Sequence, residues 1–198
     1  MLPYLLAAIL GAGGPQGVIT LKSGGLELTL DSAACHTIVS IKHEGTRLTY
    51  NAGGQGAVIN AGDWLGGAMK SGGEEQVLDL AITVDGQAVA LAPPQTIEGG
   101  QITVTKSSML ASIKHTAETK LQDGVMVQTH SFEFTEEMTL KSFYAFIYSF
   151  VPEMTHWMAE DSGGGVSGGE CKGEGAHPFS RAAKWFALYN AAAGKGVV

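Results

Sequence analysis

Positive charge is scarce in this sequence. Its 198 residues include 12 lysines and arginines against 19 aspartates and glutamates, so the formal net charge is −7. The basic residues are scattered along the chain and form neither a run nor a stripe. Proteins that bind nucleic acids present clustered positive charge to the phosphates, so we expect no nucleic-acid partner.

Long apolar runs are almost as scarce. The run at the start, Leu2–Leu10, is followed by small residues. It has about the length of the apolar core of a signal peptide and is too short for a membrane-spanning helix. We therefore predict a signal peptide over residues 1–16, a secreted or periplasmic protein, and no membrane span in the mature chain. No Lys or Arg precedes the apolar run, so an apolar first strand or a truncated start is the alternative.

Cysteine is limited to Cys35 and Cys171. In an oxidising compartment the two could form one disulfide. A single pair that is far apart in the sequence is equally compatible with two thiols, so both alternatives stay open.

Motifs of nucleophilic and metal-dependent catalysis are missing as well. The sequence has no G-x-S-x-G elbow and no Ser-His-Asp arrangement. It also lacks the compact spacing of His, Cys, Asp and Glu that is typical of metal sites. We expect no cofactor and no metal.

Glycine, by contrast, is abundant. It accounts for 28 of the 198 residues, while hydrophobic residues make up 44%. This is about twice the average glycine share of roughly 7%. A chain with a normal apolar content buries a core, so the glycines indicate many turns rather than disorder. The length is that of one ordinary domain.

Apolar and polar residues alternate along nearly every segment from Val18 onward. Such a period of two is typical of strands with one buried face. The dipeptides Glu44-Gly45, Asp85-Gly86 and Asp123-Gly124 separate alternating runs, and Asp-Gly supplies the positive φ angles of a tight hairpin turn. The only candidate helices are the N-terminal apolar run and a short turn near PEMTHWMAE. We therefore predict an all-β, mostly antiparallel fold.

The stretch IKHTAETKLQDGVMVQTHSFEF allows a prediction of strand register. If Gln122 pairs with Val125 across the Asp-Gly turn, His115 lies opposite Phe132. One face of this hairpin is then largely apolar and the other polar. His130 becomes the diagonal neighbour of His115 on the apolar face.

The strand KSFYAFIYSF is apolar on both faces and includes Tyr144 and Tyr148. A strand that is buried on both sides belongs in the middle of a layered structure, with tyrosine hydroxyls that need partners or a wet cleft. We therefore predict a large sandwich of two broad antiparallel sheets. Two glycine-rich segments, 51–76 and 161–175, are interpreted as long loops between strands.

A family resemblance supports this interpretation. The run QITVTKSSMLASIKHTAETKLQDGVMVQTHSFEFTEEMTLKSFYAFIYSFVPEMTHWMAE, with WLGGAMKSGGEEQVL and AKWFALYNAAAGKGVV, resembles galactose mutarotase-like β-supersandwich proteins. It is most similar in pattern to uncharacterised bacterial members that are associated with carbohydrate metabolism. The likeness spreads over most of residues 18–198. The family fold occurs in aldose epimerases and in domains of polysaccharide lyases and glycosidases, where sugars lie across a concave sheet.

The resemblance implies a carbohydrate partner and a single β-supersandwich domain over residues 17–198. Complete members are usually longer, and this chain ends on GKGVV, a strand start without a following turn. The domain could therefore be incomplete at its C-terminal end. The catalytic histidine and the later glutamate of aldose epimerases are not matched to positions here.

Acid–base chemistry at a sugar ring needs a group that exchanges protons near neutral pH, as histidine does. We assign this catalytic role to His115 and His130, with Glu153 or Glu160 as the partner carboxylate. The alternative is a pair of core histidines that bond to the backbone or to polar neighbours in the hairpin.

Sugar sites commonly combine an aromatic platform with carboxylates on loops at strand ends. Two segments offer that combination, GDWLGGAMKSGGEEQ and PEMTHWMAED. Each is equally compatible with a surface loop or turn. The ligand-binding residues that we predict are Asp63, Trp64, Glu74, Glu75, Tyr144, Tyr148, His156 and Trp157.

We therefore expect a secreted carbohydrate-binding or carbohydrate-active protein. If it is an enzyme, the resemblance and the histidines favour epimerisation or lyase-type proton abstraction. The alternative is a non-catalytic accessory or structural β domain of a larger secreted protein. The oligomeric state is left open.

Overall fold

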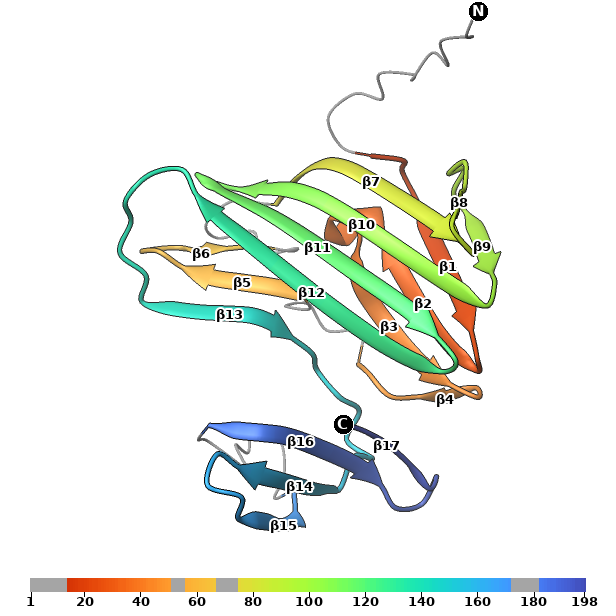
Figure 1. Ribbon diagram of the computed structural model, residues 1–198, viewed down its shortest axis with the longest axis vertical. Coiled ribbons are helices and arrows are strands. Elements are labelled where there is room, and N and C mark those ends of the chain that lie inside the picture. The colour runs from red at the N-terminus through yellow and green to blue at the C-terminus, as the bar shows by residue number, and fades with distance from the viewer. Residues whose placement is uncertain (1–13, 51–55, 67–74, 172–181) are drawn as a thin grey trace, which may run out of the picture.

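The computed structural model describes residues 14–50, 56–66, 75–171 and 182–198. In this part of the chain the regular structure is β-strand, apart from the short 3-10 helix η1 (Ser32–Ala34). Most strand pairs are antiparallel, and the sheets pack on one another (Figure 1). The predicted all-β sandwich is therefore confirmed. No helix among the described residues is long and apolar enough to cross a membrane.

One layer of the sandwich is a five-stranded sheet with the order β12-β11-β10-β7-β8. We call it the long-strand sheet, because β10, β11 and β12 are each 10 residues long. Its strands are β7 (Gln76–Val84), β8 (Gln87–Ala88), β10 (Gln101–Leu110), β11 (Ile113–Gln122) and β12 (Val125–Phe134).

The opposite layer consists of two sheets, with the orders β4-β3-β2-β1-β9 and β13-β5-β6. The pair β1 and β9 is parallel, which is an exception to the predicted antiparallel pattern. The strands of this layer are β1 (Val18–Ser23), β2 (Leu26–Asp31), β3 (Thr37–His43), β4 (Thr46–Arg47), β5 (Gly56–Asn60), β6 (Trp64–Leu65), β9 (Gln95–Glu98) and β13 (Ser142–Ile147).

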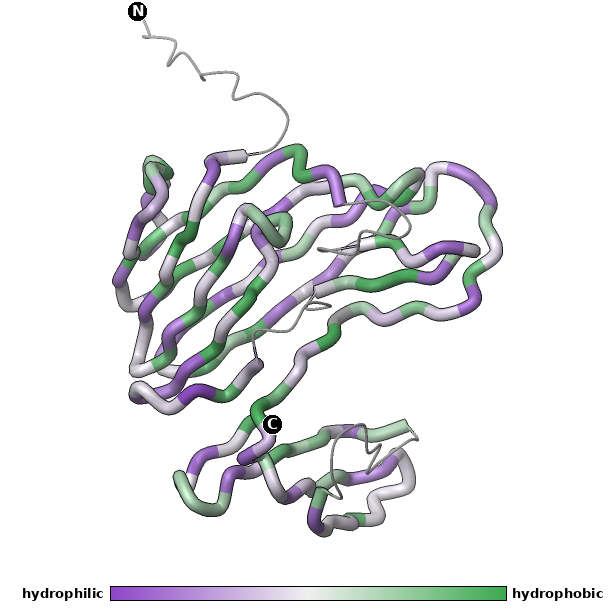
Figure 2. The backbone as a smooth tube through the Cα atoms, turned by 180° about the vertical axis from the view of Figure 1, so that it is seen from behind, coloured by the Kyte–Doolittle hydropathy of each residue, from purple (hydrophilic) through white to green (hydrophobic). Residues whose placement is uncertain are grey.

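Apolar side chains from the two layers fill the space between them. Leu28 of β2 belongs to the same buried cluster as Ile82 of β7 and Leu121 of β11. Ile59 of β5 packs in a second cluster with Ile113 of β11. The alternation of hydrophilic and hydrophobic residues that sends these side chains inward is visible along the strands in Figure 2. Removing them from water is the main favourable term in folding.

The predicted register of the central hairpin is confirmed pair by pair. Gln122 pairs with Val125, His115 pairs with Phe132, and the β11–β12 ladder runs without a shift. Its turn residues, Asp123 and Gly124, have φ angles of 52° and 76°. A type I′ hairpin turn requires positive φ at both central positions. The predicted turns at 44–45 and 85–86 also have positive φ angles at both positions.

The tight turn at Gly124 packs against the turn between β1 and β2. A Cβ added to Gly24, whose φ is +55°, would lie 2.1 Å from the backbone nitrogen of Gly124. Two backbones cannot rotate away as a side chain can. We expect Gly24→Ala to lower the free energy of unfolding by about 1 kcal/mol for the left-handed backbone and by about 1 to 3 kcal/mol more for forcing the turns apart.

Gly45→Ala is the matched control for this substitution. Gly45 also has a positive φ, +77°, but an added Cβ would meet nothing within 4 Å. It should therefore show only the left-handed cost of about 1 kcal/mol. Urea denaturation of the two variants and the parent measures the difference, and equal costs would contradict the close packing of the two turns.

A four-stranded sheet at the C-terminal end lies beside the sandwich (Figure 1), with the order β15-β14-β16-β17. Leu188 and Val197 of this sheet pack against the main apolar cluster of the sandwich. Lys195 also pairs with Glu44 of the β3–β4 turn. The strands are β14 (His156–Asp161), β15 (Val166–Glu170), β16 (Ala183–Asn190) and β17 (Lys195–Val197). The single domain over residues 17–198 stays a prediction.

Several predicted loops and positions are wrong. The sequence predicts that 141–150 is buried on both faces in the middle of a layered structure, whereas β13 is an edge strand in which Phe143 and Tyr144 are 43% and 45% exposed. The segment 51–76 contains β5 and β6, and 161–175 contains β15. PEMTHWMAED contains β14 after a short turn. β5, β6 and β15 are short and have a glycine at or beside one end, so their periodicity is too weak to be recognised.

Candidate functional site

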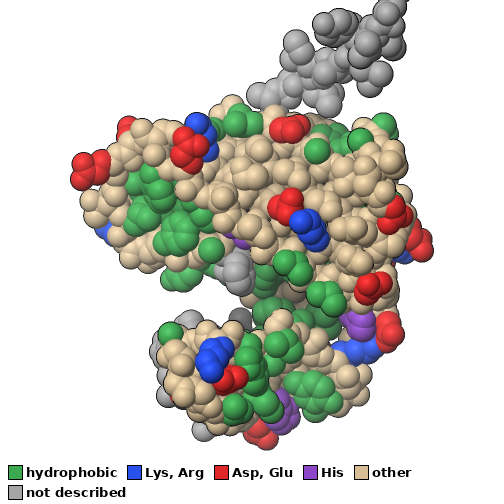
Figure 3. All heavy atoms as spheres, viewed as in Figure 1, with side chains coloured by type: hydrophobic (Ala, Val, Ile, Leu, Met, Phe, Trp, Pro, Cys, Tyr) green, Lys and Arg blue, Asp and Glu red, His purple; other side chains and the backbone are tan. Residues whose placement is uncertain are grey.

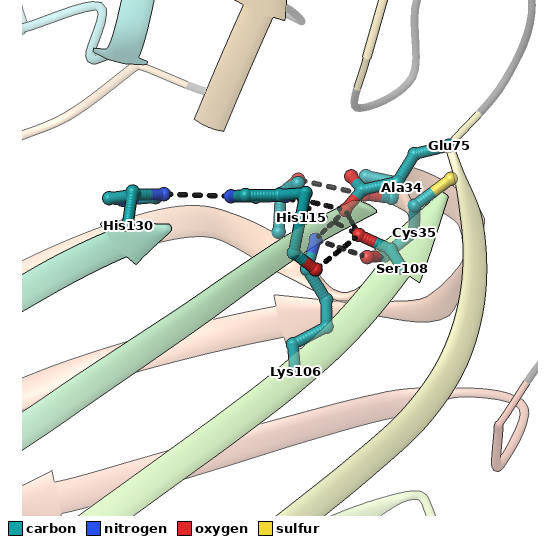
Figure 4. A network of polar contacts seen from close by, with 8 residues as sticks. Ala34, Cys35, Glu75, Lys106, Ser108, His115 and His130 are labelled. Atoms are coloured by element: carbon teal, nitrogen blue, oxygen red, sulfur yellow. Dashed lines mark hydrogen bonds and ion pairs between the residues drawn. The ribbon is translucent and has the colours of Figure 1, made fainter. Parts of the chain in front are cut away.

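Four of the buried polar residues of the sandwich lie together: Glu75, Lys106, Ser108 and His115 are each at most 6% exposed. Lys106 and Ser108 occupy inward positions of β10, in phase with its apolar residues. His115 occupies the inward position of β11 directly opposite Ser108. His130 of β12 is half-buried and lies next to His115 (Figure 4).

The long-strand sheet is irregular close to Glu75, the carboxylate of this group. The pairing of β10 with β7 shifts its register between Ser107 and Ser108. Such irregularities re-aim the side chains beside them. Glu75 directly precedes β7, and its side chain reaches across to residues of β10 and β11.

Oε1 of Glu75 is the centre of the buried network. It lies 2.5 Å from Ser108 Oγ, 2.8 Å from Lys106 Nζ and 3.3 Å from His115 Nδ1. Burial raises the pKa of Glu75, but the hydrogen bond from His115, the charge of Lys106 and the hydrogen bonds from Lys106 and Ser108 outweigh burial and lower it to about 2. The carboxylate is therefore ionised at neutral pH.

A strained backbone segment holds the other side of Lys106. Nζ of Lys106 donates a hydrogen bond to the carbonyl oxygen of Cys35 at 3.1 Å. Cys35 and the next residue, His36, have φ angles of 55° and 53°. Left-handed backbone costs about 1 to 2 kcal/mol for each residue other than glycine. Strain of this kind clusters at functional sites, although it persists wherever the surrounding structure supports it.

The two histidines extend the network toward β12. Nε2 of His115 lies 2.9 Å from Nδ1 of His130, and the two ring planes differ by 4°. The rings meet edge to edge in one plane (Figure 4). The face of the His115 ring packs on Phe132, with the ring centroids 4.7 Å apart. The predicted proximity of His115 and His130 is confirmed.

The environment keeps His130 neutral. Burial lowers the pKa of His130 to about 4, any positive charge on His115 and the charge of Lys106 act in the same direction, and Glu75 opposes them. At pH 7 the imidazole of His130 is therefore unprotonated on one nitrogen and acts as both a donor and an acceptor.

A second polar chain continues along the hairpin. Tyr148 donates a hydrogen bond to Gln128 Oε1, and Gln128 Nε2 donates to Thr119 Oγ1 at 3.1 Å. Burial raises the pKa of Tyr148, so its hydroxyl stays a neutral donor. The predicted need of this tyrosine for a partner is met by Gln128.

Aromatic side chains border the histidines. Phe143 of β13 meets Phe132 edge to face, with centroids 4.8 Å apart. The next residue, Tyr144, stacks with Trp64 of β6, with centroids 6.3 Å apart. Neighbouring residues of a strand point to opposite faces. The Tyr144–Trp64 pair therefore lies on the face of its sheet that is turned away from Phe132.

Three of the predicted residues lie apart from the histidines or outside the described chain. Asp63 is exposed in the turn between β5 and β6, next to Trp64. Glu153 is exposed in the turn that precedes β14. Glu74 lies outside the described residues.

The other predicted residues lie on β14 in the C-terminal sheet. Glu160 accepts hydrogen bonds from Lys184 Nζ at 2.6 Å and from Trp185 Nε1 at 2.8 Å. His156 and Trp157 line a separate open pocket of about 510 Å³ on this sheet. The structure thus divides the predicted site, because it brings Glu75 to the histidines and leaves Glu160 with partners of its own.

Lys106 and Ser108 belong to the site but are not among the residues that the sequence predicts. Both lie in QITVTKSSML, where they alternate in phase with residues that the fold buries. A charged residue at a position where the pattern requires an apolar one is a signal for a buried partner. Nothing in the sequence, however, indicates that the partner is Glu75.

Comparisons with known proteins do not identify the chain. No protein-family model, curated protein or solved structure matches it. The resemblance to the galactose mutarotase-like family therefore rests on the sequence pattern alone. The function has to be inferred from the geometry of the site.

The described part of the chain offers little for binding a metal ion or for thiol chemistry. No group of three or more His, Cys, Asp or Glu side chains is arranged there to hold a metal ion. Cys35 and Cys171 are separate thiols. Burial raises the pKa of Cys171, which makes its thiolate scarce at neutral pH.

Proposed function

We propose that the protein is a secreted carbohydrate-binding β-sandwich whose ligand face lies around His130 and the aromatic side chains of Phe132 and Phe143. The observation that supports this most is the hydrogen-bonded chain from the buried Lys106–Glu75 pair through His115 to His130. Burying charges costs desolvation free energy, and apolar residues of similar size often stabilise a core better. Buried groups with shifted pKa values are typical of functional sites.

Exposed aromatic surface beside polar groups favours a carbohydrate as the ligand. Phe143 is 43% exposed, and it meets Phe132, which packs on the histidines. Ligand sites use apolar and aromatic surface for affinity and a few polar groups for orientation. A sugar ring offers an apolar face and hydroxyl edges that match both.

The protonation of His130 favours binding over catalysis. A general base works best when its pKa lies near the working pH. The pKa of His130 is lowered to about 4, so at neutral pH this side chain is a hydrogen-bond acceptor and only a weak base. Epimerisation or lyase-type proton abstraction would need a ligand that raises this pKa.

Loss of the exposed phenylalanine tests the ligand face. We expect Phe143→Ala to weaken sugar binding about tenfold, since an aromatic contact is worth about 0.5 to 1.5 kcal/mol beyond its buried area. Calorimetric titration with a panel of mono- and oligosaccharides measures the affinity of the parent and of the variant.

Tyr189→Ala is the matched control, because Tyr189 is 45% exposed, close to the 43% of Phe143, but lies in the C-terminal pocket. Its affinity for sugars should equal that of the parent. Loss of binding in Tyr189→Ala alone would move the ligand face to the C-terminal sheet, where Figure 3 shows hydrophobic side chains at the surface. A parent protein that binds no sugar of the panel would count against a carbohydrate ligand.

A non-catalytic structural domain is the second candidate, and the burial of Nε2 of His130 favours it. In this case the polar network holds the two layers in register and meets no ligand. The NMR resonances of the His130 ring would then stay unchanged whichever sugar is added. A sugar-dependent shift of these resonances would favour the binding site.

A further inference from the structure

The buried network contains a single cation that is positioned to control the two histidines. We infer that Lys106 is a positioning residue, which acts through Glu75 and His115 to keep the proton of His130 on Nδ1 and to leave Nε2 as the unprotonated nitrogen. The placement of the proton follows from the protein alone and does not depend on the proposed function.

The first step is the charge of Glu75. Its Oε1 lies 2.8 Å from Lys106 Nζ, and both side chains are at most 7% exposed. A buried carboxylate keeps its charge when a cation and hydrogen-bond donors compensate it. The pair is neutral as a whole, so a further charge on His115 would lack a counter-charge.

The second step fixes the proton of His115. The hydroxyl of Ser108 donates to Glu75 Oε1 at 2.5 Å, since the other possible acceptors, Nδ1 and the carbonyl oxygen of His115, are farther away at 3.3 and 3.4 Å. Nδ1 of His115 therefore faces only acceptors, at 3.3 Å to Glu75 Oε1 and 3.3 Å to Ser108 Oγ. A neutral imidazole in this position carries its hydrogen on Nδ1.

The third step determines which nitrogen of His130 carries the hydrogen. With the hydrogen of His115 on Nδ1, its Nε2 has a lone pair and accepts from His130 Nδ1 at 2.9 Å. His130 must then be the donor through Nδ1, and a neutral His130 has no hydrogen on Nε2.

Removal of the Lys106 charge reverses the direction of the hydrogen bond between His115 and His130. This holds for both protonation states of Glu75. If Glu75 takes up a proton, it donates to His115 Nδ1, and the hydrogen of His115 moves to Nε2. If Glu75 stays ionised and His115 becomes the compensating cation, Nε2 of His115 again carries a hydrogen. In both states His115 donates to His130, which then carries its own hydrogen on Nε2.

Long-range ¹⁵N–¹H NMR of the full chain with ¹⁵N-labelled histidine distinguishes the two tautomers at pH 7. The protein has six histidines, and His130→Gln assigns the signals of His130. In the parent we expect a protonated Nδ1 and an unprotonated Nε2. In Lys106→Met the two nitrogens exchange these states, while Lys106→Arg keeps the parent pattern.

Lys114→Met is the matched control, because Lys114 lies in the neighbouring strand with an exposed partner, Glu133. It should leave the tautomer of His130 unchanged. A parent with its hydrogen on Nε2, or an unchanged tautomer in Lys106→Met, overturns the inference. If Lys106→Met does not fold, Lys106→Gln, which keeps a donor without the charge, decides in the same way. No sugar is needed, so a failed ligand screen and a failed tautomer assignment are separate results.

Discussion

Glu75→Ala is expected to lower the free energy of unfolding by about 3 to 5 kcal/mol at pH 7. The substitution leaves the ammonium group of Lys106 buried without its carboxylate, and breaking one side of a buried ion pair has a cost of this size. It also removes the acceptor of Ser108 and of His115 Nδ1. Urea denaturation followed by fluorescence measures the change.

Glu133→Ala is the control for this prediction, because Glu133 pairs with Lys114 on the same sheet with both side chains exposed. Exposed ion pairs contribute about 0 to 1 kcal/mol, so the control should lie within that range. The double variant Glu75→Leu with Lys106→Met should recover much of the lost stability, since it leaves no uncompensated charge in the core. A single variant Glu75→Ala as stable as Glu133→Ala would mean that the carboxylate is not buried with Lys106.

Acidification is expected to destabilise the protein by about 4 kcal/mol between pH 7 and pH 2. The first part comes from His130, whose ordinary pKa is 6.5 and whose pKa in the folded protein is about 4. Between these values the unfolded chain binds the proton and the folded protein does not, so stability falls as the pH falls. A shift of this size corresponds to roughly 3 kcal/mol, which solvent screening of the half-buried ring reduces to about 1 to 2 kcal/mol.

The second part comes from Glu75, whose pKa is lowered from 4.5 to about 2. Its contribution is complete above pH 4.5 and is lost as the pH falls toward 2, which amounts to about 3 kcal/mol. Stability measured at half-unit intervals should therefore fall first between pH 6.5 and 4 and then more steeply below 4.5.

The variant His130→Gln separates the two parts of this acid response. It should flatten the profile between pH 6.5 and 4.5 and keep the steeper loss below it, since Glu75 and Lys106 remain. A parent profile that is flat from pH 6.5 to 4.5 would show that His130 titrates at its ordinary pKa in the folded protein.

Local patterns account for the parts of the fold that the sequence predicts well. In the β11–β12 hairpin, the Asp-Gly turn and a two-residue alternation leave one register in which the apolar face stays intact, and every pair follows from it. The turns at Glu44-Gly45 and Asp85-Gly86 follow from the same chemistry. Each of these features depends on residues that are close in the chain.

Segments whose burial depends on distant partners are predicted poorly. The short strand β5 is bordered by glycine, and its buried residue Ile59 is covered by residues of β10 and β11, far away in the sequence. β13 has apolar residues on both faces, yet it is an edge strand with Phe143 and Tyr144 at the surface. Apolar character alone does not decide whether another layer covers a strand.

The sequence by itself determined the all-β class, the tight turns and the pairing that makes His115 and His130 neighbours, because hydrophobic period and turn chemistry act locally. Only the tertiary structure decided that Glu75 and Lys106 meet at these histidines while Glu160 does not. The physical reason is that a buried charge selects its partner through the packing of β7, β10 and β11, and sheet order is set by the whole core. The chemistry of this site is therefore a property of the packed layers.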